Sequence, residues 1–274
     1  MNAAVMTGWR RTLLADAALA NAARFWFLVA AAGQSVFAFY IAFFYGGAAV
    51  QGRPEAWNQI LPHGYVAGNT LGNAVLGAHL LFAAAITLAG TLQLVPSIRA
   101  RFPRFHRWNG RAYVIVAFIM GASGLYLVLS GRKLVGDVPQ HVAVCLNAIL
   151  IMLCAAMTWR HALARDFSAH RRWALRLFLV VNGVWFFRVE LMFWLFVNQG
   201  PVGFDPKTFT GPLLTFLGFS QTLLPLAVLE IYLRAKEQGH SVGKLATAAG
   251  LVILSVAMGL GEFAAFMGMW LPRL

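Results

Sequence analysis

Residues 78–111 read A-H-L-L-F-A-A-A-I-T-L-A-G-T-L-Q-L-V-P-S-I-R-A-R-F-P-R-F-H-R-W-N-G-R, an apolar segment that ends in a basic turn, after which a second segment begins. His79 lies on the apolar segment, and His106 lies where the next one starts. The pattern occurs again, because His141 lies on a later apolar segment and His170 begins H-R-R-W-A-L-R after a second basic turn. These two stretches predict two helical hairpins with histidines at matched positions.

The composition places these hairpins in a membrane. The chain is 60% hydrophobic and only 11% charged, with a mean hydropathy of +0.69. Apolar runs recur, each long enough for the roughly 20 residues of a membrane-spanning helix. Backbone groups in lipid must bond internally, and alternating strands of about ten residues are absent, so helices are indicated. We predict an all-α membrane protein with seven transmembrane helices, at residues 25–46, 71–96, 112–130, 140–158, 173–197, 210–233 and 245–267.

The distribution of positive charge predicts the orientation. Sixteen of the 22 Lys and Arg residues lie on one side of the predicted spans, five lie on the other, and Arg188 lies inside a span. The positive-inside rule then puts the N-terminus in the cytoplasm and the C-terminus outside, in a bacterial cytoplasmic (inner) membrane. The basic loops should lie against anionic lipid headgroups, so membrane lipid is the expected partner and nucleic acid is not. The five outer cations are Arg53, Arg132, Lys133, Lys207 and Arg273.

The chain is expected to form one membrane domain, residues 24–274, after a short N-terminal segment. Asp16 interrupts the apolar part of residues 1–23, which predicts an amphipathic helix on the cytoplasmic surface and not a signal sequence. The histidines define a core at residues 71–197, in which spans two to five form a four-helix bundle built from the two repeated hairpins. Pro103 suits the first turn of the third span, and Asp166 or Ser168 suits the cap of the fifth.

The four histidines fall at two levels of this bundle. By helical rise, His79 and His141 both lie about 30 Å above the basic boundary, while His106 and His170 lie close to it. Neutral imidazole is a usual axial ligand of haem iron, and helix bundles build such sites from inward-facing side chains.

This arrangement resembles the di-haem transmembrane cytochromes b, such as the ascorbate-dependent ferric reductases, in which four consecutive helices each give one histidine and alternate helices pair. The resemblance covers spans two to five. It implies that His79 and His141 hold an outer haem b and that His106 and His170 hold an inner one. The cations expected to contact the cofactor are Arg107, Arg171 and Arg188.

A closer resemblance concerns the motifs themselves. They are H-x-x-x-x-x-x-x-x-x-x-G-T-L-Q-L from His79, R-F-P-R-F-H-R-W-N-G-R around His106 and H-R-R-W-A-L-R from His170. Over roughly residues 75–195 the chain is similar to a family of bacterial membrane proteins known only as a domain of unknown function. The resemblance implies a multi-span membrane protein and leaves its function open.

Three classes of function follow. The first is a b-type cytochrome that moves electrons within or across the membrane between a quinol or small reductant and an acceptor. The second is a cofactor-free transporter or channel built on the repeat, which the apparent lack of Gly- or Pro-interrupted helices at mid-membrane disfavours. The third is a structural or assembly subunit of a larger complex or oligomer. In the cofactor-free readings, the outer histidines are packed polar residues, and the inner ones cap turns and bind headgroup phosphate.

Charged residues inside the spans suggest two ion pairs. Arg188 and Glu262 are predicted at similar levels of different spans, so pairing would hide both charges. Glu230 precedes Arg234 by four residues, the spacing of a pair on one helix face. In the outer loop at 47–70, Trp57, His63 and Tyr65 are expected to rest on the membrane interface or to line the mouth of a site.

Overall fold

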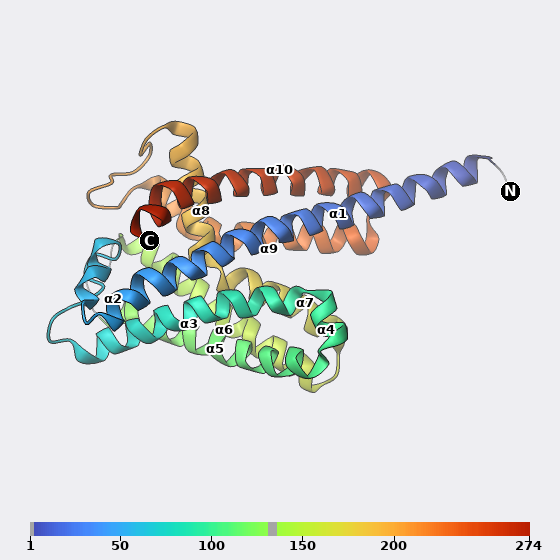
Figure 1. The fold of residues 1–274 in the computed structure, drawn as a ribbon. Coiled ribbons are helices and arrows are strands. Elements are labelled where there is room, and N and C mark those ends of the chain that lie inside the picture. Colours follow the sequence, from blue (N-terminus) through green and yellow to red (C-terminus); the bar gives the residue numbers. More distant parts are fainter. Residues whose placement is uncertain (1–2, 131–135) are drawn as a thin grey trace.

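The computed structural model describes residues 3–130 and 136–274, and the side chains from residue 11 onward. Two of the expected outer cations, Arg132 and Lys133, lie outside the described residues. Within the described ranges the elements are helices, accompanied by one isolated bridge between Asp205 and Thr210 (Figure 1). The predicted all-α fold is confirmed.

Six helices in the described ranges are long and apolar enough to cross a membrane. They contain α1 (Ala3–Tyr40), α3 (Thr70–Leu94), α5 (Pro103–Leu129), α6 (Val138–Leu163), α9 (Pro212–Gln238) and α10 (Ser241–Ala265). A seventh crossing is formed if α7 (Phe167–Val181) and α8 (Gly183–Asn198), which are bent by 55° at their junction, count as one broken span. The number of spans is therefore six or seven, and the predicted positions match these helices.

Short helical segments connect or extend the spans. Two of them are π-helices that continue α1 and α10, namely η1 (Ile41–Gly46) and η3 (Phe266–Trp270). The others are α2 (Gly47–Val50), η2 (Pro54–Gln59), α4 (Pro96–Arg101) and η4 (Leu271–Arg273). We call the end at which α1 stops and α3 begins the outer end, after the predicted orientation, and the end that carries α4 the basic end.

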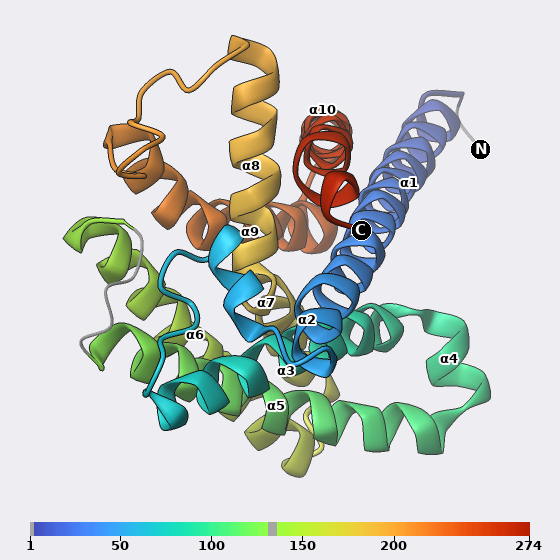
Figure 2. The same ribbon diagram turned by 60° about the vertical axis from the view of Figure 1, so that its left-hand side comes forward.

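The two predicted hairpins form one packed unit. Helix α3 packs on α5, α5 packs on α6, and α6 packs on α7 (Figures 1 and 2). Gly90 of α3 allows one close approach, since a Cβ there would lie 2.8 Å from the Tyr113 ring and 3.2 Å from the Phe178 ring. The buried apolar core of this unit consists of Ile86, Tyr113, Ala117, Ile151, Cys154, Ala155, Leu177 and Val180.

The helix starts follow the local signals in the sequence. Pro103 occupies the first turn of α5, where its missing N–H costs no hydrogen bond. Asp166 is the N-cap of α7, and its carboxylate accepts a hydrogen bond of 3.0 Å from the backbone N–H of Ala169. Both predicted capping features are confirmed, with Asp166 and not Ser168 as the cap.

The junction between α7 and α8 is a break within an apolar stretch that is otherwise helical. Asn147 of α6 stabilises it by donating to the freed Val180 carbonyl (3.0 Å) and to the Thr222 hydroxyl of α9 (2.8 Å). Gly183 is needed here, because a Cβ would lie 2.9 Å from the Asn147 amide nitrogen. In Figure 2, α8 accordingly stands away from α3, α5 and α6. The expectation that the mid-membrane region lacks interrupted helices is wrong, since the apolar run at 173–197 gave no sign of the break.

Helix α1 is continuous through residue 23 and runs for 38 residues, or about 57 Å, far more than a membrane of about 30 Å requires. Its N-terminal part projects beyond the other helices (Figure 1). There the Lys244 ammonium of α10 lies 2.6 Å from the Asp16 carboxylate. The surface position expected for residues 1–23 stays a prediction, and the structure shows no helix break at its boundary.

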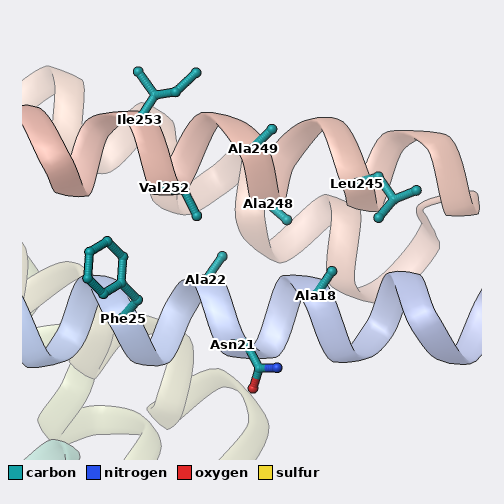
Figure 3. A pocket seen from close by; sticks show the side chains of 9 residues that line it. All are labelled: Ala18, Asn21, Ala22, Phe25, Leu245, Ala248, Ala249, Val252 and Ile253. Carbon is teal, nitrogen blue, oxygen red and sulfur yellow. The ribbon is translucent and has the colours of Figure 1, made fainter.

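Small side chains bring α1 and α10 together along much of their length. Ala18 and Ala22 of α1 point toward Ala248 of α10 (Figure 3), and Ala22 and Ala248 are both buried. Small residues at a helix interface in lipid allow close backbone approach and better packing. A shallow apolar groove of about 610 Å³ runs beside this contact and includes Phe25 and Ile253.

The orientation can be tested with reporter fusions. A reporter at Leu274 and one in the basic turn at 99–111 should report opposite sides of the membrane, with the basic turn in the cytoplasm, because cations concentrate at that end. Periplasmic phosphatase and cytoplasmic fluorescence fusions at both positions provide the measurement. The same side for both would mean that α7 and α8 do not cross the membrane as one span.

Candidate functional site

The structure brings two of the four predicted histidines together. His106 lies in the first turns of α5, His170 lies in the first turn of α7, and the two rings are close enough to interact electrostatically. His170 Nδ1 lies 3.0 Å from the backbone carbonyl oxygen of Thr158 on α6. Because a carbonyl oxygen only accepts hydrogen bonds, Nδ1 carries the proton, and in the neutral ring the Nε2 lone pair remains for another partner.

His106 is half-buried, and its Nδ1 atom is buried without a hydrogen-bond partner among the described residues. An orphaned ring nitrogen is unusual, because buried polar groups are nearly always paired. The inner pair thus consists of one imidazole with a fixed tautomer and one whose Nδ1 atom has unmet bonding capacity.

The residues of the sequence motifs fix the backbone around His106. Gln93, from G-T-L-Q-L, donates a hydrogen bond of 3.1 Å to the His106 carbonyl oxygen. In the reverse direction, Asn109 of H-R-W-N-G-R donates one of 3.1 Å to the Ala89 carbonyl oxygen. Gly110 leaves room for Gln93, whose amide oxygen would lie 3.3 Å from an added Cβ. The motifs therefore tie α3 to α5 directly beneath the histidine.

The arginines of the basic end divide into free and paired ones. Arg107 and Arg171, which follow the two inner histidines, are exposed. Arg176 is instead bound to Glu230 of α9, with a nitrogen–oxygen distance of 2.7 Å. The predicted pair of Glu230 with Arg234 is wrong, because the Glu230 side chain reaches across to α7 and does not lie along its own helix.

The outer histidines are arranged differently. His79 Nδ1 lies 2.8 Å from the Ser123 hydroxyl oxygen of α5, and that hydroxyl also lies 3.2 Å from the Met120 carbonyl oxygen. His79 and Ser123 thus share a hydrogen bond between helices, and its donor depends on the tautomer of the imidazole. His141 is half-buried on α6. The described contact of the His79 ring is with Ser123 and not with His141.

Space exists beside His79. If Gly124 had a Cβ atom, the Cε1 atom of His79 would lie 3.9 Å from it. No other atom of a neighbouring element would lie within 4 Å. One edge of the imidazole therefore borders an unfilled part of the α5 surface. This observation shows room for a methyl-sized group beside His79 and gives no information on His141.

A metal site made only of side chains does not fit the described part of the chain. It contains no group of three or more His, Cys, Asp or Glu residues that could hold a metal ion. Haem differs, because the porphyrin supplies four ligands and the protein needs to supply only one or two axial ones. The two-histidine arrangement is therefore compatible with haem and not with a structural zinc site of four side chains.

Arg188 is not placed as expected. Its guanidinium lies 5.4 Å from the centroid of the Phe37 ring on α1, and it donates to the Val184 carbonyl oxygen at 3.2 Å. The predicted pair with Glu262 is wrong, since the Glu262 carboxyl lies against Gly33, where an added Cβ would overlap it. The two side chains contact α1 one helical turn apart, and among the described residues they form no ion pair. None of the contacts described for Arg188 reaches a histidine.

The sequence analysis missed an aromatic cluster at the outer end. Successive rings lie 5.5–6.4 Å apart by their centroids. The cluster consists of Phe37, Tyr40, Tyr45, Trp57 and Trp270. Tyrosines and Gln34 within an apolar run were a signal in the sequence, but the run was read only as a span.

The outer loop covers this cluster. Trp57 is buried, and its indole N–H donates a hydrogen bond of 3.0 Å to the Tyr45 carbonyl oxygen. Tyr65 is half-buried and His63 is exposed. Trp57 thus closes the outer end of the bundle and does not rest on the membrane interface.

These helices and their composition define a multi-span helical membrane protein. The chain belongs to the family described as Predicted membrane protein (DUF2306), whose profile matches residues 76–219. That stretch runs from α3 into α9 and contains all four candidate histidines, which confirms the resemblance to a family of unknown function. No curated protein and no solved structure matches the chain.

Proposed function

We propose that this protein is a b-type cytochrome that transfers electrons within or across its membrane, between a quinol or small reductant and an acceptor. The observation that supports it most directly is the approach of His106 and His170 on α5 and α7 at the basic end. A hydrogen bond from Nδ1 orients the imidazole and leaves Nε2 free to coordinate a metal. Second-shell hydrogen bonds orient histidine ligands in this way in known metal sites.

In this proposal His106 and His170 hold one haem b. When bound, its iron accepts and releases a single electron. The chain contributes the two axial nitrogens, and the Thr158 carbonyl orients the ring of His170. Arg107 and Arg171, exposed at the same end, are placed to meet the propionates or anionic lipid headgroups.

A second haem b near His79, with His141 as its other ligand, has weaker support. Its support is that Ser123 holds the His79 ring by a hydrogen bond and that Gly124, which has no side chain, lies beside that ring. The inner pair therefore has more support than the outer pair. The difference arises because contacts across helices, and not depth alone, position an axial ligand.

The test is an absorption spectrum of the purified full-length protein, expressed with haem supplied. A protein with two axial histidines should show the narrow visible bands of six-coordinate low-spin haem b on reduction. Pyridine extraction should give about one haem per chain if only the inner site fills, and about two if both do. A colourless, correctly folded protein would end the proposal.

One observation favours a second candidate, a cofactor-free transporter. Transporters often place their substrate site at a discontinuous helix near mid-membrane. Here the break between α7 and α8 lies beside the polar groups of Asn147 and Thr222, and Pro225 interrupts the hydrogen bonding of α9 nearby. A colourless protein would leave this candidate standing, whereas a stoichiometric haem spectrum would favour the cytochrome.

A further inference from the structure

The outer ends of α1 and α10 share an uncommon backbone feature. Each passes into a π-helix, η1 after Tyr40 and η3 after Ala265, and such segments frequently occur at functional sites. The two lie side by side, because the Trp270 ring of η3 is 5.5 Å from the Phe37 ring and 6.2 Å from the Tyr40 ring, by centroids. The aromatic cluster described above lies at this junction.

Buried polar atoms without partners collect next to the junction. Among the described residues, Gln34 is fully buried, and neither its amide nitrogen nor its amide oxygen has a hydrogen-bond partner. The indole N–H groups of Trp185 and Trp270 are also buried and unpaired. Native structures contain few such groups, and each of them requires an explanation. Several of the buried, unpaired polar atoms in the described part of the chain therefore lie in this region, although others lie elsewhere, His106 Nδ1 among them.

Glu262 supplies the ionisable group of this region. Its carboxyl lies against the Gly33 backbone of α1, and one carboxyl oxygen is buried without a partner. It precedes Trp270 by eight residues, which puts it roughly 12 Å below the outer end by helical rise. Ionisable residues inside a membrane usually mark ion or proton pathways when they face a bundle interior.

Polar side chains lead from Glu262 toward the outer end. Gln34 follows Gly33 in the sequence, Tyr40 comes six residues later and about 9 Å further along the axis of α1, and Tyr45 follows with its ring 6.0 Å from that of Tyr40. The groups that can titrate or that bear charge around this region, from each helix packed there, are Tyr40, Tyr45, Arg188, Glu190 and Arg273. Arg188 and Arg273 both interact electrostatically with the two tyrosines. Arg273 is only half-buried, so it marks the point where the row meets the surface.

We propose that Glu262 is a proton-exchange site that is served from the outer end of the bundle through Gln34, Tyr40 and Tyr45. A proton that arrives from the outer solution binds a carboxylate oxygen of Glu262, and the same path returns it when the carboxyl ionises. The step involves no electron transfer and no co-reactant. It is independent of haem, so it stands or fails separately from the proposed cytochrome function.

Carbodiimide labelling tests this proposal, because dicyclohexylcarbodiimide adds to a protonated carboxyl and rearranges to a stable N-acylurea. The full-length protein in sealed right-side-out vesicles is labelled while the pH of one side varies and that of the other is held. Mass spectrometry measures the label on Glu262. Labelling should fall as the outer pH rises, by up to about tenfold per pH unit, and should ignore the inner pH.

Two variants examine the path, and one carboxyl serves as an internal control. Tyr40→Phe keeps the ring contacts and removes only the hydroxyl, whereas Gln34→Leu removes the amide. After a jump in the outer pH, the labelling of Glu262 should change at least several-fold more slowly in each variant than in the unchanged protein. Glu190, which faces Ser220 of α9, lies outside the row and should not follow the outer pH. Control by the inner pH, absence of label on Glu262, or an unchanged response in Tyr40→Phe would each overturn the proposal.

Discussion

Replacing His170 with alanine should remove the inner haem component from the absorption spectrum, and His106→Ala should remove the same component to the same extent. Both side chains would supply axial nitrogens to one iron, so the loss of either destroys the six-coordinate low-spin state. The amplitude of that component should fall by more than 80%. At a haem concentration near its Kd, this loss corresponds to a weakening of the haem-binding free energy by roughly 1 kcal/mol or more. Reduced-minus-oxidised spectra of the purified variants provide the measurement.

His161→Ala is the matched control for this pair. His161 lies at the same basic end, on the last turn of α6, and is near the Asp166 carboxylate at 3.7 Å. Its removal deletes an imidazole without touching either proposed ligand, so the spectrum should not change. If His161→Ala bleached the protein as strongly as His170→Ala, the loss of haem would report damage to the basic end and not the loss of a ligand.

The outer histidines extend the series. His79→Ala and His141→Ala should both diminish a second spectral component, equally for either change, if an outer haem is bound. Loss of one shared component in His79→Ala and His106→Ala, with His141→Ala unaffected, would keep haem and refute the proposed pairing. Helical circular dichroism of each variant separates ligand loss from unfolding.

The spans were predictable because lipid leaves the backbone few choices. A stretch of about 20 apolar residues must form a helix, and local signals such as Pro103 and Asp166 fix where helices begin. The break after Val181 was not predictable in the same way. The run at 173–197 is apolar throughout, and the freed Val180 carbonyl is paired by Asn147, which belongs to another helix.

The candidate site was predictable in the parts that depend on repeat and spacing. Matched positions in two hairpins predicted His106 and His170 at one level, and in the structure both lie at the basic end, within electrostatic range of each other. The partners of Glu230 and Arg188 depend on which helices lie side by side and on how far a long side chain reaches. Sequence spacing favoured Arg234 for Glu230, but α7 packs on α9 and offers Arg176 at closer range.

The same limitation explains why the outer cluster went unnoticed. Gln34, Tyr40 and Tyr45 are each tolerable alone in an apolar helix, and only the packing of α10 against α1 shows that their polar atoms are buried. Burial of unpaired polar groups is a property of the assembled bundle. A sequence shows that such residues exist, whereas their environment is set by helices more than 100 residues away.

Gly261→Leu should produce the largest loss of stability, about 3 kcal/mol or more, because it forces α10 away from α8. A Cβ at this position would overlap the Val189 carbonyl oxygen and lie 3.1 Å from the Phe193 Cβ atom. A backbone oxygen cannot turn aside as a flexible side chain can, so the helices themselves must separate. Small residues at such contacts are what allow helices to pack closely in lipid.

Gly250→Leu provides the control within the same helix. No atom lies within 4 Å of a Cβ at Gly250, so the substitution should be neutral or should stabilise α10 by up to about 1 kcal/mol through helix propensity. Unfolding of both variants by SDS in mixed micelles, followed by tryptophan fluorescence and circular dichroism, measures the difference. Equal stability of the two variants would show that α8 and α10 do not meet at Gly261. The position of α10 would then be wrong, and with it the placement of Glu262 against α1.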